Sequence, residues 1–140
     1  MKYKRIRQIT KAKKAKKLKN VQLWNLDATL ARIIASGVYQ FMKMERHTIP
    51  NCLTSDNKID CEQEEELCKQ WDAVLNEIVW TFSEIADNYP NSPIDAWLDS
   101  HKETADKQIP EEIFENMKVY KERIANGKQL FVKAFDDLWD

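Results

Sequence analysis

An apolar row in the middle of the chain repeats with the period of an α-helix, and it constrains the fold more than any other feature. With spacings of three, four or seven residues, the row consists of Cys61, Cys68, Trp71, Leu75, Ile78, Phe82 and Ile85. Such spacing places these side chains on one helical face, which has to be buried against another element. Asp60 followed by Gln63 is typical of a helix N-terminus. We therefore predict a long helix over residues 61–88.

Two further segments show the same period. In residues 27–45 the stripe consists of Leu30, Ile34, Val38 and Phe41, widened by Ile33 and Met42. In residues 111–139 it consists of Ile113, Met117, Tyr120, Ile124, Phe131, Ala134 and Leu138, thickened by Phe114, Leu130 and Phe135. The four prolines fall between the periodic segments, and the chain has only two glycines, which argues against a β-rich fold.

Three long helices with apolar stripes have to bury those stripes against one another. We therefore predict an all-α fold, an antiparallel three-helix bundle. A short extra helix near residues 93–99 is indicated by "SPIDAW", with Ser92 as its cap and Pro93 at its first position. A length of 140 residues fits one such domain over residues 21–140, preceded by a basic arm over residues 1–20.

The arm is defined by its charge. Residues 1–19 contain no acidic residue and ten basic ones: Lys2, Lys4, Arg5, Arg7, Lys11, Lys13, Lys14, Lys16, Lys17 and Lys19. Residues 20–140 then hold 12 basic against 23 acidic residues, a charge of about −11. The ten basic residues are a candidate nucleic-acid-binding site that contacts phosphates without sequence preference. The alternatives are an arm that lies on its own acidic domain, a solvated extension, and a basic amphipathic helix that binds a membrane surface or a groove.

The sequence excludes several classes of protein. No apolar run approaches 18 residues, which predicts no membrane span, and no apolar segment follows the basic N-terminus as in a secretory signal. An odd number of cysteines at irregular spacing fits a reduced, cytoplasmic protein. No motif of a phosphate-binding loop, a serine hydrolase or a zinc protease is present. We therefore predict no catalytic residue, no cofactor and a non-enzymatic protein.

One set of residues has the chemistry of a metal site. His47, Cys52, Cys61 and Cys68 have side chains that bind zinc, but their spacing matches no zinc finger. Cys61 and Cys68 also fall on the apolar row, where cysteine acts as a small hydrophobic residue. We expect no bound metal.

The candidate partner-binding residues are Trp80, Glu77 and Glu84. Trp80 lies nine residues after Trp71, and therefore about half a turn round the same helix. One tryptophan then faces the apolar seam and the other faces away. Trp80 either packs beneath the short helix near residues 94–98 or forms an exposed aromatic anchor for a partner protein.

Three stretches of the chain carry a family resemblance. They are "WNLDATLARII" (24–34), "WDAVLNEIVWTFSEIA" (71–86) and "ERIANGKQLFVKAFDDLWD" (122–140). Their W-x-L-D-x-T-L-A, W-x-x-x-L-x-x-I-V-W-x-F and L-F-x-K-x-F-x-x-L-W patterns resemble a family of small uncharacterised helical proteins encoded by tailed bacteriophages. His47, in "HTIPN", replaces the glycine usual in that family. The resemblance implies a phage accessory protein in the host bacterial cytoplasm and no catalytic residue.

Three functions follow as hypotheses. The first is a non-enzymatic phage accessory protein that binds a host bacterial protein, with a defence or gene-expression factor as the expected target. The second is a nucleic-acid-binding accessory protein that acts through the arm. The third is a small-ligand binder or an enzyme whose site has no recognisable motif.

Overall fold

The computed structural model describes residues 19–45, 61–103 and 108–138. In chain order, their elements are α2 (Asn20–Trp24), α3 (Leu26–Lys43), α4 (Cys61–Ala86), α5 (Pro93–Ser100), α6 (Glu111–Ala134) and the 3-10 helix η1 (Phe135–Asp137). No strand occurs among these described residues, and the predicted all-α class is confirmed. The predicted basic arm lies almost entirely outside the described ranges.

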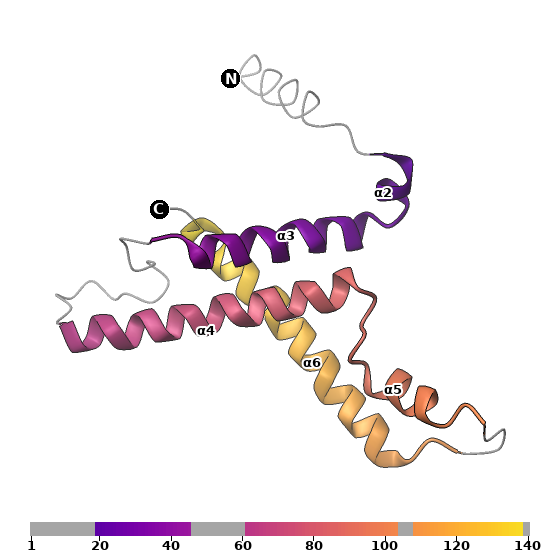
Figure 1. Cartoon of the computed structure of the whole chain (residues 1–140). Helices are drawn as coiled ribbons and strands as arrows, with labels where there is room; N and C mark the ends of the chain where they lie inside the picture. The colour runs from indigo at the N-terminus through magenta and orange to yellow at the C-terminus, as the bar shows by residue number, and fades with distance from the viewer. Residues whose placement is uncertain (1–18, 46–60, 104–107, 139–140) are drawn as a thin grey trace, which may run out of the picture.

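Helices α3 and α4 run antiparallel and side by side (Figure 1). The face of α4 that packs against the rest of the molecule consists of Trp71, Leu75, Ile78, Phe82 and Ile85, all of them buried. Burial of each such side chain contributes roughly 1.5–3 kcal/mol. The row predicted for this helix is therefore confirmed from Trp71 onward. Its earlier member Cys68 is exposed, so the expectation that this cysteine belongs to the seam was wrong.

The buried face of α3 is narrower than predicted and consists of small residues. Ala31, Ala35 and Val38 are its buried members. Leu30 and Ile33, assigned to the buried stripe from the sequence, are 47% and 58% exposed. Small side chains let two helix backbones approach closely, whereas the prediction gave weight to large apolar residues and passed over alanine. Leu30 and Ile33 are consequently left on its outer side, whereas Ile34, Phe41 and Met42 are partly buried and pack against the core, as the predicted stripe required.

An arginine ties α3 to the end of α4. The Arg32 side chain on α3 donates a hydrogen bond to the Ala86 carbonyl, at 3.2 Å, and its guanidinium lies 3.9 Å from the Asp87 carboxylate. The last carbonyls of a helix lack intrahelical partners and carry partial negative charge, so a cation there is stabilising. Arg32 therefore helps to set the register of α3 along α4.

Helix α6 crosses α4 rather than running along both α3 and α4 (Figure 1). The crossing is close at Gly127, where an added Cβ atom would lie 1.8 Å from Thr81 Oγ1. Beyond the crossing, the N-terminal part of α6 packs with α5, away from α3. The all-helical architecture is thus an antiparallel pair with a third helix across it. The finer prediction of an antiparallel three-helix bundle is not confirmed by this arrangement.

The link from α4 to α5 reverses the chain within a few residues. The Tyr89 and Asn88 backbone N–H groups donate to the Glu84 and Ile85 carbonyls, at 2.7 and 3.3 Å, a pattern that ends helices in a Schellman motif. Asn88 and Tyr89 both have positive φ angles, 60° and 59°. Asparagine tolerates this left-handed conformation well, whereas for a bulky residue such as tyrosine it is strained.

Helix α5 corresponds to the short helix predicted near residues 93–99. Pro93 occupies the start of the helix and Ser92 the N-cap position, both as expected. However, the Ser92 hydroxyl makes no capping hydrogen bond. It is buried and lies 3.6 Å from the Met117 sulfur, so Ser92 joins α5 to α6 instead.

Candidate functional site

A buried carboxylate lies where α4, the following loop and α6 meet. Glu84 is only 4% exposed, and it accepts hydrogen bonds from Tyr120 Oη at 2.6 Å, Asn91 Nδ2 at 2.5 Å and the Asn91 backbone N–H at 3.3 Å. Three donors offset much of the cost of removing a carboxylate from water. Burial, reinforced by the hydrogen bond to Glu84, raises the pKa of Tyr120 above its ordinary value.

Trp80 lies beside this carboxylate and contacts α6. Its ring packs edge-on against Tyr120, with 6.0 Å between centroids, and the Arg123 guanidinium lies 3.5 Å from its ring centroid. Arg123 in turn donates two hydrogen bonds to the Glu77 carboxylate, at 2.6 and 3.0 Å. The hydrogen bond to Glu77 raises the pKa of Arg123, so the cation over the indole ring stays charged.

The three predicted partner-binding residues are therefore brought together, but by contacts within the chain. Trp80, Glu77 and Glu84 all contact side chains of α6, and the ring and cation contacts of Trp80 described above are with α6 rather than α5. Trp71, half a turn away, is buried in the core with α3, as the two-sided reading of these tryptophans predicted. Recognition of a partner through Trp80, Glu77 and Glu84 stays a prediction.

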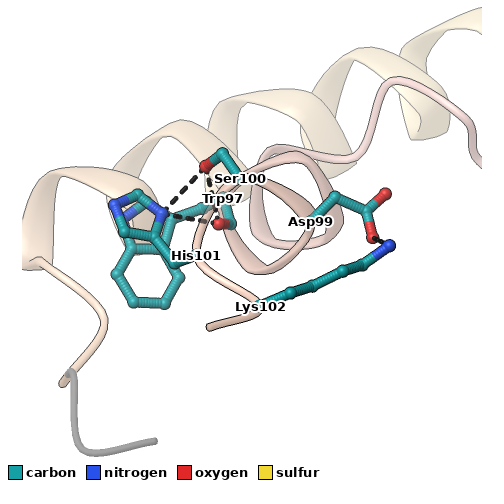
Figure 2. A network of polar contacts seen from close by, with 5 residues as sticks. All are labelled: Trp97, Asp99, Ser100, His101 and Lys102. Atoms are coloured by element: carbon teal, nitrogen blue, oxygen red, sulfur yellow. Dashed lines mark hydrogen bonds and ion pairs between the residues drawn. The ribbon is translucent and has the colours of Figure 1, made fainter. Parts of the chain in front are cut away.

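The C-terminus of α5 carries a polar network that resembles a serine–histidine pair (Figure 2). Ser100 Oγ and His101 Nδ1 lie 2.8 Å apart, and each also lies 2.8 Å from the Trp97 carbonyl oxygen. A carbonyl only accepts hydrogen bonds, so Nδ1 bonds to it only in the tautomer that carries the proton on Nδ1, and in that tautomer it does not accept one from Ser100. His101 also stacks on the Trp97 ring at 4.3 Å. These contacts end the helix and do not prepare a nucleophile.

The remaining predicted sites fall mostly outside the described residues. Of the ten basic residues of the arm, only Lys19 is described, and it is exposed. His47 and Cys52 are not described, whereas Cys68 is exposed on α4. Within residues 19–45, 61–103 and 108–138, no three His, Cys, Asp or Glu side chains gather as a metal site would require. Nucleic-acid binding by the arm stays a prediction.

The sequence did not indicate an apolar groove between α3 and the end of α6. This α3 groove has a volume of about 310 Å³ and is lined by Ile33, Ile34, Gly37, Val38, Phe41, Phe131, Phe135 and Leu138. It continues toward the N-terminus of α3 as a row of exposed side chains, Leu26, Leu30 and Ile33. Trp24, just before α3, is 87% exposed. The signal for this row is the heptad-like spacing of large apolar residues on the outer side of α3, opposite its alanines.

A second groove lies along the middle of α6, beside the loop that follows α4. This Tyr89 groove has a volume of about 420 Å³ and is lined by Tyr89, Met117, Tyr120, Lys121, Ile124, Ala125, Lys128 and Gln129. No motif marks it, because a loop residue and one side of a helix come together only through the crossing of α4 and α6.

Comparison with known proteins does not indicate a function for the chain. No family model, no curated protein and no solved structure matches the chain. Among the helices that the structure describes, none is both long and apolar enough to cross a membrane.

Proposed function

We propose that this chain is a non-enzymatic interaction protein that binds an amphipathic helix of a host bacterial protein in the α3 groove. The observation that carries the proposal is the exposed apolar row Leu26, Leu30 and Ile33, which leads into the groove. Contiguous exposed apolar surface of this kind is uncommon on monomeric proteins unless it binds something.

The geometry of the groove favours a helix as the bound segment. Its walls come from α3 on one side and from the end of α6 with η1 on the other, so neither wall offers a strand edge to an extended peptide. At Gly37 no atom lies within 4 Å of the position that a Cβ would occupy. The groove is therefore open at that point, and an apolar helix can lie close to the α3 backbone.

The assignment to a host protein rests on the resemblance to small proteins of tailed bacteriophages. Such an accessory protein acts in the bacterial cytoplasm, where a defence or gene-expression factor is the expected target. Nucleic-acid binding through the basic arm is the second candidate, supported by the ten positive charges of residues 1–19 and their lack of acidic neighbours.

The proposal is tested by capture from a nuclease-treated bacterial lysate, followed by direct binding of the identified protein. Ile33→Asp places a charge in the α3 groove, whereas Val119→Asp makes the same change at a 64% exposed valine elsewhere. We expect the wild type and Val119→Asp to capture one host protein and Ile33→Asp to lose it. Equal capture by all three proteins would contradict the assigned surface. Capture that depends on intact nucleic acid would favour the arm instead.

A further inference from the structure

The Tyr89 groove combines an apolar floor with two cations. Met117, Ile124 and Ala125 supply apolar surface along one side of α6. Lys121 and Lys128 lie two helical turns apart on the same side, about 10 Å along the axis. Neither lysine forms an ion pair with another residue that the structure describes.

Several other cations of the described residues are held by carboxylates, whereas these two lysines are not. Arg123, on a different side of α6, is held by Glu77. Lys69 pairs with Glu65 on α4, and Lys102 pairs with Asp99 at the end of α5. No acidic residue lines the groove itself, and Glu84 behind it already accepts three hydrogen bonds and is covered by Tyr120. The groove therefore offers positive charge at its edge without an internal anion to neutralise it.

The wall opposite α6 is formed by a residue in a strained conformation. Asn88 has the left-handed conformation that the end of α4 requires, but the following residue, Tyr89, has a φ of 59° as well. A left-handed tyrosine is strained and persists only where its surroundings hold it. Tyr89 is the one residue lining the groove that does not belong to α6.

We propose that the Tyr89 groove binds a small anionic amphiphile, a molecule with one apolar chain or ring and one carboxylate or similar head. The apolar part lies on Met117, Ile124 and Ala125 against Tyr89, and the head binds the ammonium group of Lys121 or Lys128. A volume of about 420 Å³ falls within the range of small-molecule sites, roughly 300–1,000 Å³. The groove is separate from the α3 groove, so this binding does not depend on the proposed protein partner.

The requirement for a negative charge is tested with two ligands that have similar alkyl chains and head groups of opposite charge. Isothermal titration calorimetry of the full chain with decanoate, below its micellar concentration, is expected to show saturable binding at one site. Decyltrimethylammonium, with the same chain length and a positive head, is expected to bind at least about tenfold more weakly. Equal binding of both ligands, or no saturable binding of decanoate, would overturn the proposal.

The location of the decanoate site is tested with two double variants that each remove two lysines. Lys121→Gln combined with Lys128→Gln should weaken decanoate binding about tenfold. Lys118→Gln combined with Lys133→Gln removes two exposed lysines of α6 that do not line the groove, and should leave binding unchanged.

Two further variants show which of the two grooves binds decanoate. Ala125→Trp fills the groove at an exposed helical position and should abolish binding while circular dichroism still shows a folded chain. Ile33→Asp, in the α3 groove, should bind decanoate as the wild type does. Loss of binding in Ile33→Asp together with full binding in Ala125→Trp would place the ligand in the α3 groove and refute the inference.

Discussion

The close crossing of α4 and α6 makes Gly127→Ala the most informative single substitution in this chain. The new Cβ would lie 1.8 Å from Thr81 Oγ1, and a rotation of the Thr81 side chain moves that oxygen away. It does not move Thr81 Cβ, which the backbone holds 2.6 Å from the new atom. Carbon atoms pack at about 3.5–4.0 Å, so the two helices have to separate by roughly 1 Å.

The cost follows from that separation. A gap of about 0.5–1 Å already forfeits a quarter to a half of the dispersion energy of each contact across it. Overpacking of this kind costs about 1–3 kcal/mol and occasionally more. Alanine recovers about 0.8–1.0 kcal/mol relative to glycine within a helix. Because the overlap is deep, we expect Gly127→Ala to lower the free energy of unfolding by about 2 kcal/mol.

Gly37 provides the matched control for this experiment. It also lies within a helix, and no atom lies within 4 Å of its added Cβ. Gly37→Ala should therefore raise the free energy of unfolding by about 0.5–1 kcal/mol. Urea denaturation followed by circular dichroism measures both variants. If Gly127→Ala were as stable as the wild type, or stabilised like Gly37→Ala, the close crossing would be wrong.

Three other predictions concern the core, the buried carboxylate and the arm. Phe82→Ala should lower the free energy of unfolding by about 3–5 kcal/mol in urea denaturation, because this ring is buried and packs on Phe131 at 5.0 Å; a near-neutral effect would contradict its place in the core. The raised pKa of Tyr120 means that the unfolded chain loses this proton first, so wild-type stability should fall as pH rises above about 10. Tyr120→Phe should weaken that fall whereas Tyr39→Phe, at an exposed tyrosine, should not; equal alkaline profiles for both variants would refute the coupling. Deletion of residues 1–19 should leave a folded domain, and duplex DNA binding by the full chain should show a log–log salt slope of about −4 to −5 if four to six phosphates are contacted. Binding that survives the deletion, or that ignores salt, would exclude the arm as the site.

The fold could be predicted from the sequence where large apolar side chains mark the buried face of a helix. The row from Trp71 to Ile85 was predicted because large apolar residues at helical spacing usually form the buried face of a helix. On α3 the same reasoning selected Leu30 and Ile33, because alanines at a close helix contact carry little apolar surface of their own. Nothing in the sequence alone shows that α4 and α6 touch at Gly127.

The candidate sites were harder to predict because each depends on residues far apart in the chain. Glu84 resembled a surface charge on an amphipathic helix, and only Tyr120 and Asn91, brought in by the crossing helix and the loop, make its burial tolerable. Likewise, the strained φ of Tyr89 has no local signal, since tyrosine is not a residue that turns favour.

The parts of the molecule on the two sides of the crossing at Gly127 also differ in local stability. The core cluster extends along α6 only as far back as Tyr120, so the first turns of α6 and all of α5 bury little against α4. Segments of that kind open locally at a smaller free energy than the global one. Amide hydrogens of residues 93–100 and 113–119 should therefore exchange with solvent well before those near Leu75. The α3–α4 pair would then persist as a folded unit while α5 and the first turns of α6, with Met117 of the Tyr89 groove, open and close beside it.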